Sequence, residues 1–363
     1  MRLGTCIALE LVAAAGVVGG ACLGVIQVSR LADDYLAAPE AEVEVAAADP
    51  RPLVAPLPSS ELRVVVPAAP VPTVFGAPDA ELLAPLGAAK VTRVKWNVGG
   101  STISLRLDFA NGARAAFKPE QIHLQSDPRR EIAAYSLDRL IGLGRVPPAK
   151  PGAIPLAEVT AAIDPAYREL IAERLAKEAT VRDGVVHGEL SWWIPEIRQA
   201  RIGAYGVDEP EGRALWISYL QIGAVIPPAV RPLVEQLVAC VLFDVLTDNP
   251  DRWSGNNTVG SPDGKAFYVM DNTMTFSLAR FGHELNLGVL HRIQVFPRGL
   301  VGRIRALTEE RFAAALELGG ETGLGRLLEP REIHAVIQRR DNLMKYIDQL
   351  IAAHGEAAVL GLP

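Results

Sequence analysis

The sequence predicts an α+β fold in which a β-rich part precedes a helical part, and two patterns favour it. Apolar and polar residues alternate over 103–109, which is the period of a half-buried strand. Asn111-Gly112 then signals a hairpin turn, and residues 114–118 supply the returning strand. Helical patterns dominate the second half of the chain. They cover residues 233–246, 286–307, 309–318 and 329–353.

Two helices are predicted between the hairpin and the helical half. The first begins after Asp127-Pro128 and ends near Gly142, because proline is favoured in a first turn and glycine after a last one. Glu131 lies in its first turn, where the helix dipole favours a carboxylate. The second covers residues 162–179, where charged and apolar residues have helical spacing.

The chemistry-bearing feature of the second half is a set of two acids and an amide. Asp251 is followed five residues later by Asn256, and Asp271 ends the apolar run 267–270. Phosphoryl transfer uses such a set: one carboxylate accepts the proton of the attacking hydroxyl, while an amide and another carboxylate hold the divalent metal. The same D-x-x-x-x-N spacing occurs in protein kinase catalytic loops, although ordinary turns also contain these residues.

The upstream residues supply the other half of a nucleotide site. Gly99-Gly100-Ser101 forms a loop rich in backbone N–H groups and enters the hairpin, whose last residue is Lys118. This is the arrangement of a phosphate-covering loop and a phosphate-pairing lysine, and Glu131 would hold that lysine by an ion pair. The alternatives are a surface hairpin with a solvated lysine and a helix with a simple end-charge preference.

Four segments that carry these residues resemble a known family. They are residues 116–119, 131–148, 249–252 and 270–272. The chain resembles the secretory-pathway kinases, the family of the Golgi casein kinase and the proteoglycan xylose kinase, and is distantly similar to the phosphatidylinositol 3- and 4-kinase fold. The resemblance covers residues 95–350 and implies a bilobal protein-kinase-like domain. Its expected bounds are 81–195 for the N-lobe, 196–353 for the C-lobe and 354–363 for a tail.

The resemblance implies a kinase that uses ATP with Mg²⁺ or Mn²⁺ and a hydroxyl of a protein or glycan as acceptor. Lys118 would contact the phosphates, and Glu131 would orient that lysine or help to hold metal. Asp251 would be the catalytic acid–base residue and Asp271 the metal ligand. Asn256, the second expected ligand, matches the lipid-kinase pattern D-R-x-x-G-N better than the secretory one.

One departure from the family leaves alternatives open. Asn272-Thr273-Met274 stands where the secretory kinases usually carry a glycine and an arginine. A membrane-tethered pseudokinase that acts as a binding or scaffold module is therefore one alternative, and an enzyme that transfers AMP is another. A lipid acceptor has weaker support.

Residues 185–195 read as a strand that ends at a proline, where the connector between the lobes is expected. Its backbone is a candidate for contact with adenine, and core packing of Trp192 and Trp193 is the alternative. His283 and His291 follow the metal motif, and a surface or capping role is expected for both.

The N-terminal 80 residues are predicted to lie outside the catalytic domain. Residues 11–28 form a run of eighteen residues that is apolar apart from Gln27 and just long enough to span a bilayer, so residues 1–30 are expected to be a signal anchor or a signal peptide. Residues 31–80 have the composition of a Pro/Ala-rich linker. We expect attachment to a membrane through this anchor, with the catalytic domain on the extracytoplasmic side.

Composition excludes several other classes of function. The 363 residues carry 36 basic and 42 acidic side chains, a net charge of −6, and no basic cluster predicts nucleic-acid binding. The six histidines have no zinc-ligand spacing, and the sequence has no G-x-S-x-G elbow or P-loop. Cys240 is the one cysteine beyond the apolar segment, so no disulfide is expected in the catalytic domain.

Overall fold

The computed structural model describes residues 72–98, 101–254, 257–279, 282–317 and 323–363. The chain divides into two units, Met1–Val65 and Val66–Pro363, and all described residues belong to the second. The expected anchor at 1–30 and the linker as far as residue 71 lie outside the described residues. Within the described ranges, no helix is both long and apolar enough to cross a membrane.

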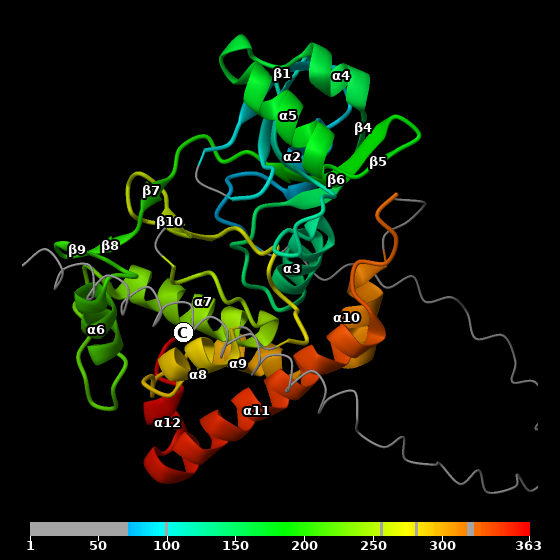
Figure 1. Ribbon diagram of the computed structural model, residues 1–363. Helices are drawn as coiled ribbons and strands as arrows, with labels where there is room; N and C mark the ends of the chain where they lie inside the picture. Colours follow the sequence, from blue (N-terminus) through cyan, green and yellow to red (C-terminus); the bar gives the residue numbers. More distant parts are fainter. Residues whose placement is uncertain (1–71, 99–100, 255–256, 280–281, 318–322) are drawn as a thin grey trace, which may run out of the picture. The chain divides into compact units, whose positions relative to one another are not determined.

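An antiparallel sheet forms the first part of the described chain (Figure 1). The predicted hairpin is confirmed: Leu105 lies opposite Phe117 in adjacent strands, and both side chains are fully buried. Gly112 makes the turn with φ of +83°, a region that glycine adopts readily. The sheet order is β1 (Val91–Trp96), β2 (Leu105–Phe109), β3 (Arg114–Pro119), β6 (Val185–Trp192) and β4 (Ala149–Pro155), and β5 (Val181–Arg182) also pairs with β6.

Helix α3 (Pro128–Leu140) packs against the sheet and against the C-terminal helices. The Asp127 side chain caps it by accepting a hydrogen bond from the backbone N–H of Arg129, and Gly142 follows its end with φ of +67°. Both predicted boundaries of this helix are confirmed. The neighbouring helices are α4 (Leu156–Ala161), a 3₁₀ turn (Pro165–Tyr167) and α5 (Arg168–Glu178).

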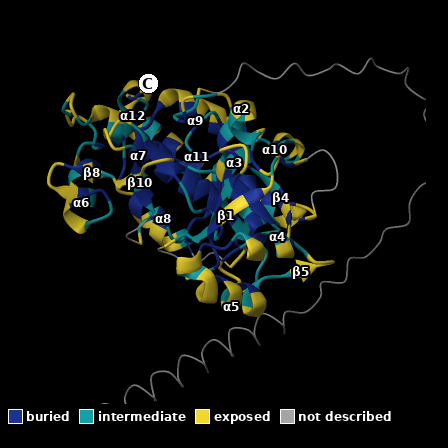
Figure 2. Cartoon of the chain, turned by 90° about the horizontal axis from the view of Figure 1, so that it is seen from above, coloured by how far each residue is buried: buried dark blue, intermediate teal, exposed yellow. Residues whose placement is uncertain are grey.

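The second part is helical and is centred on α7 (Arg231–Thr247), which Figure 2 shows as largely buried. Side chains from Gln236 to Thr247 are all buried, which explains why its sequence is apolar without a polar face. Helix α11 (Pro330–His354) packs against α7. The remaining helices are α2 (Asp79–Leu83), α6 (Pro210–Ser218), α8 (His283–Leu290), α9 (Arg298–Arg305), α10 (Glu309–Leu316) and α12 (Glu356–Val359).

Two small sheets complete the second part. The first has the order β11 (Phe267–Val269), β10 (Thr258–Gly260) and β7 (Arg198–Gln199), and the second pairs β8 (Arg201–Ile202) with β9 (Tyr205–Gly206). Strand β11 ends two residues before Asp271, so this sheet fixes the position of the Asp271 backbone.

One predicted helix is wrong in extent. The pattern over 286–307 is not one helix, because α8 ends at Leu290 and α9 begins only at Arg298. Pro297 lies between them, and proline both lacks an N–H and disfavours helical backbone in the residue before it. Phe296 instead donates its N–H to the carbonyl of Val359, so the segment between α8 and α9 contacts the C-terminal segment.

The linker predicted at 31–80 is wrong for its last residues. Phe75 is buried between the rings of Trp192 and Tyr268, at 5.8 Å from each centroid. Asp79 begins α2 and accepts hydrogen bonds from Arg139 and Tyr135 of α3. The aromatic residue and the acid find partners far away in the sequence, which a composition rich in proline and alanine does not reveal.

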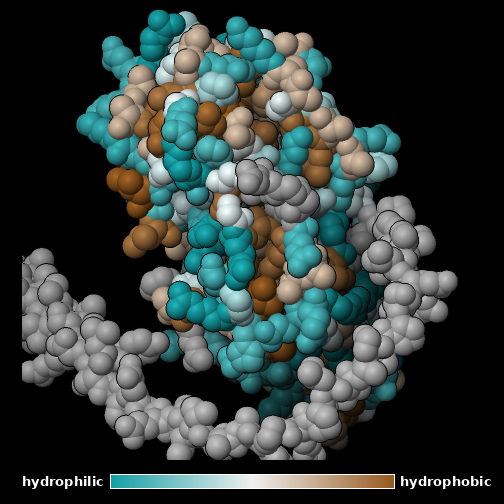
Figure 3. All heavy atoms as spheres, turned by 90° about the vertical axis from the view of Figure 1, so that its right-hand side faces the viewer, coloured by the Kyte–Doolittle hydropathy of each residue, from teal (hydrophilic) through white to brown (hydrophobic). Residues whose placement is uncertain are grey.

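Buried apolar side chains form one cluster under the sheet and a larger one among the helices. The predicted α+β class, with a β-rich first part and a helical second part, is confirmed. On the face shown in Figure 3, hydrophobic residues are interspersed with hydrophilic ones over both parts. The expected tail at 354–363 contains α12, and its Val359 and Leu362 are buried.

Candidate active site

Lys118 of β3 is held between two carboxylates. Its Nζ lies 2.6 Å from Oδ1 of Asp271 and 3.6 Å from Oε2 of Glu131, and its side chain is 12% exposed. Burial lowers the pKa of Lys118, but the charges of Asp271, Glu131 and Glu189 raise it more, so the net pKa lies above the ordinary value. The ammonium group is therefore charged at neutral pH.

A cleft of about 270 Å³ contains this lysine. Strands β3 and β6 and the segment between β1 and β2 supply one wall, and β10 with the residues after β11 supplies the other. Three residues predicted to bind nucleotide or metal line it together: Lys118, Glu131 and Asp271. The structure thus brings side chains from β3, from α3 and from the end of β11 to one concave site, the usual setting of a ligand site.

Asp271 has a left-handed backbone, with φ of 56°. Aspartate tolerates this region better than most residues. The left-handed backbone at Asp271 changes the direction of the chain after β11. Burial raises the pKa of the Asp271 carboxyl, but the charge and hydrogen bond of Lys118 lower it more, so the net pKa lies below the ordinary value. Its side chain is still 42% exposed, which leaves oxygen atoms open to the cleft.

The loop around Asp251 follows α7. Helix α7 ends at Thr247, and Asp248, which caps it, has a left-handed backbone with φ of 55°. Asn249 then accepts a hydrogen bond from the backbone N–H of Asp251 at 2.9 Å and donates through Nδ2 to the carbonyl of Asp271 at 3.4 Å. This asparagine therefore ties the two predicted functional acids to each other, although the sequence did not single it out.

Asn257 contacts the Asp251 carboxylate. Its Nδ2 donates to Oδ2 of Asp251 at 2.8 Å, and Ser254 donates to Oδ1 at 2.7 Å. Asn257 also lines the cleft, so it connects Asp251 to the site of Lys118. Asn256, the predicted amide ligand, lies outside the described residues, and so do Gly99 and Gly100. Ser101 is described; its carbonyl accepts a hydrogen bond from Arg174, and the neighbouring Thr102 lines the cleft.

Glu131 makes its shortest contacts with Asn272 rather than with Lys118. The backbone N–H of Asn272 donates to Oε2 of Glu131 at 2.7 Å, and its Nδ2 donates to Oε1 at 2.9 Å. Both carboxylate oxygens are thus satisfied inside the protein. From the sequence, Asn272 belonged to the segment 270–272 and to the departure that follows, but its side chain was assigned no role.

Glu189 is a buried acid of the cleft that sequence reasoning missed. It lies opposite Lys118 in the register of β3 and β6, is 1% exposed, and accepts a hydrogen bond from Ser191 at 2.6 Å. Burial and the negative charge of Glu131 raise the pKa of Glu189 to about 8, although Lys118 lowers it. The signal available in the sequence was the presence of an acid inside the strand predicted at residues 185–195.

The free energy of unfolding should depend on pH because Glu189 binds its proton more tightly in the folded state than in the unfolded state. Folded Glu189 keeps its proton to a pH of about 8, whereas an unfolded glutamate loses it near pH ~4.3. Between these values the folded state binds more protons, so the free energy of unfolding falls as pH rises. Glu189→Gln should remove a fall on the order of 4 kcal/mol in the free energy of unfolding between about pH 5 and pH 8, measured by urea unfolding. Ser191→Ala keeps the carboxyl and should keep the slope; parallel curves for wild type and Glu189→Gln would contradict the assignment.

The end of β6 and the residues after it line the cleft. This is the place expected for the segment that connects the two lobes. Trp193, Ile194 and Pro195 are among the residues that line the cleft. The backbone N–H of Trp193 already donates to the carbonyl of Arg114 at 3.3 Å, and proline has no N–H. Contact of this segment with adenine stays a prediction.

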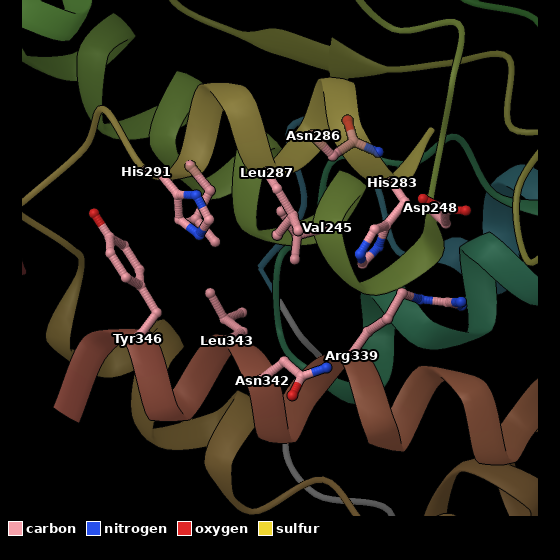
Figure 4. Close-up of a pocket in the computed structure, with 11 residues that line it drawn as sticks. Val245, Asp248, His283, Asn286, Leu287, His291, Arg339, Asn342, Leu343 and Tyr346 are labelled. Carbon is pink, nitrogen blue, oxygen red and sulfur yellow. The ribbon is translucent and has the colours of Figure 1, made fainter. Parts of the chain in front are cut away.

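A second cavity, of about 130 Å³, lies among α7, α8 and α11 (Figure 4). His283 and His291 line it together with Asp248, so they do not line the cleft that holds Lys118. Asn286 of α8 donates to the carbonyls of Asp244 and Asn249 at 3.2 and 3.0 Å. This side of the molecule therefore supports the loop that carries Asp251.

Comparison with known proteins identifies the fold. No family model matches the sequence. The structure matches the Golgi casein kinase with a TM-score of 0.61 and 16% identity, over 78% of this chain and 77% of that one. The same kinase with Mn/ADP bound matches at 0.59 and 16%, over 78% of each chain. A hydra Fam20 with sugar matches at 0.54 and 16%, over 80% of this chain and 94% of that one. The resemblance drawn from the sequence is confirmed at the level of the fold.

Proposed function

We propose that this protein is a kinase that transfers the γ-phosphoryl group of ATP to a hydroxyl of a protein or glycan. The observation that carries the proposal is Lys118 between Glu131 and Asp271 in a cleft, with Asp251 tied to that cleft through Asn249 and Asn257. These are the charged groups that phosphoryl transfer requires, on the fold that the Golgi casein kinase shares.

Different residues of the cleft would bind the nucleotide and transfer the proton. Lys118 binds and orients the phosphates, while Glu131 holds the lysine in place. Asp251 accepts the proton of the attacking hydroxyl, and the hydrogen bonds from Ser254 and Asn257 fix its carboxylate. Gly99, Gly100 and Ser101, the glycine-rich loop predicted from the sequence, cover the phosphates. Most of the rate enhancement comes from positioning and from charge stabilisation, because phosphoryl transfer needs little other chemistry from the protein.

The donors in the cleft fit a hard divalent cation. Asp271 presents carboxylate oxygens on a partly exposed side chain, and Asn257 presents an amide in the same cleft. We assign Asp271 and Asn256 as the residues that hold Mg²⁺ or Mn²⁺. When bound, the cation supplies positive charge against the phosphates. The structure of the Golgi casein kinase with Mn/ADP supports this choice.

We further propose that residues 1–30 attach the protein to a membrane and that the catalytic domain is extracytoplasmic. The apolar run at 11–28 and the fold shared with a Golgi kinase support this location. The similar structures are those of a casein kinase and of a Fam20 with sugar, which supports a protein or glycan acceptor over a lipid.

A scaffold without turnover is the second candidate, and one contact favours it. Lys118 pairs with Oδ1 of Asp271 at 2.6 Å, so a cation at Asp271 competes with the ammonium group for this carboxylate. A pseudokinase that keeps this ion pair would have the kinase fold but would not bind the cation and the nucleotide.

Thermal-shift titration with ATP and Mn²⁺ or Mg²⁺ tests the proposal. We expect a rise in Tm that needs both nucleotide and metal, because ligands that bind the folded state stabilise it. Intact-mass measurement of modified acceptors then separates phosphoryl transfer from transfer of AMP. Absence of any shift with every nucleotide–metal pair would favour the scaffold.

A further inference from the structure

Asn272 connects α3 to the loop of Asp251 through hydrogen bonds at both ends of its amide. Its side chain is fully buried. On one side, Nδ2 and the backbone N–H donate to the two carboxylate oxygens of Glu131, at 2.9 and 2.7 Å. On the other side, Oδ1 accepts from Nη2 of Arg252 at 2.8 Å. The amide of Asn272 thus joins Glu131, which lies 141 residues upstream, to Arg252, which lies 20 residues upstream.

Arg252 carries the connection into the second part of the fold. It is fully buried, forms an ion pair with Asp244 of α7 at 3.3 Å, and donates to the carbonyls of Met270 and Asn257. Since Arg252 follows Asp251 directly, its position sets the backbone of the proposed catalytic residue. Buried charged and amide groups of this kind hold their geometry because each lost hydrogen bond leaves an unsatisfied group.

We propose that Asn272 is a positioning residue that couples the placement of Glu131 on α3 to the loop of Asp251. The path runs from Lys118 through Glu131, Asn272 and Arg252 to Asp244. Movement of α3 away from the cleft breaks the contacts of Asn272 and releases the restraint on Arg252. The catalytic consequence of this coupling rests on the proposed function, whereas the coupling itself does not.

The chemistry of the amide gives a specific test. Asn272 donates to Glu131 and accepts from Arg252, so it has to be an amide and not an acid. Asn272→Asp keeps the acceptor for Arg252 but places a carboxylate against the carboxylate of Glu131. Adding Glu131→Gln restores a donor toward position 272. Asn286→Asp is the matched control, because Asn286 is also buried and its Nδ2 supports the same loop through the carbonyls of Asp244 and Asn249.

Amide hydrogen exchange on the full chain measures the coupling below the temperature of global unfolding. Asn272→Asp should raise exchange by about tenfold in both α3 and residues 248–254, and Glu131→Gln in that background should reverse both increases. Asn286→Asp should raise exchange in residues 248–254 and leave α3 unchanged, without rescue by Glu131→Gln. Exchange that changes in only one of the two segments, or a failure of rescue, would overturn the proposal.

Affinity for Mn²⁺·ATP adds a second measurement. Asn272→Asp should weaken nucleotide–metal binding more than Asn286→Asp does at equal thermal stability, because it displaces the glutamate that holds Lys118. A wild-type protein that binds no nucleotide would contradict the proposed function, while the exchange experiment would still decide whether Asn272 couples the two segments.

Discussion

Asp271→Ala is expected to abolish nucleotide–metal binding and phosphoryl transfer together. The carboxylate is the partly exposed acid of the cleft that contacts Lys118, and it is the proposed metal ligand. Without it, the charge that holds the cation is lost, and the phosphates lose the cation that neutralises them. Transfer should fall by at least about 1,000-fold, since catalysis of this kind depends more on charge stabilisation than on any other single effect.

Stability should change much less than binding in this variant. Lys118 keeps Glu131 at 3.6 Å, so the ammonium group does not become a buried charge without a counterion. We therefore expect a shift in Tm of only a few degrees, together with loss of the ATP- and metal-dependent stabilisation. Asp271→Asn is the isosteric control and should also lose that stabilisation. Retention of full metal-dependent stabilisation in Asp271→Ala would exclude Asp271 as the ligand.

Local signals made the first half of the site predictable. Lys118 ends a hairpin that alternation and Asn111-Gly112 specify, and Glu131 lies in a helix whose start and stop residues are standard. The order of these residues along the chain, with Asp251 and Asp271, also led to the correct fold. Such features depend on neighbours within a few residues, where spacing carries the information.

Contacts between distant segments were not predictable in the same way. Asn272 and Glu131 are 141 residues apart, and Glu189 meets Lys118 only through the register of β3 and β6. Phe75 finds its aromatic partners in a segment whose composition indicates a linker. In each case a tertiary contact decides the role of the residue, and a single sequence contains no pattern that marks the pair.

The break after α8 has a similar cause. Apolar spacing over 286–307 continues across Pro297, so the periodicity favoured one helix where the structure has two. The proline was the local signal that should have outweighed it. The reason the break is stable lies elsewhere, in the hydrogen bond from Phe296 to Val359 near the C-terminus.

Asp251→Asn is expected to abolish transfer while sparing nucleotide–metal binding. The carboxylate of Asp251 accepts hydrogen bonds from Ser254 and Asn257 and lies outside the contacts of Lys118. An amide of the same shape can keep one of these hydrogen bonds but cannot accept the proton of the attacking hydroxyl. Loss of a general base typically costs about 100- to 10,000-fold in rate.

The two acids therefore separate binding from chemistry. Asp251→Asn should show the full rise in Tm with ATP and Mn²⁺ and no measurable transfer, whereas Asp271→Ala should show neither. Asp263→Asn, which changes an exposed carboxylate in the turn before β11, is the control and should match wild type in both. Equal transfer rates in Asp251→Asn and wild type would remove Asp251 from the mechanism. Since Asn249 ties the backbone of Asp251 to that of Asp271, loss of binding in Asp251→Asn would mean that the loop positions the metal ligand as well as the base.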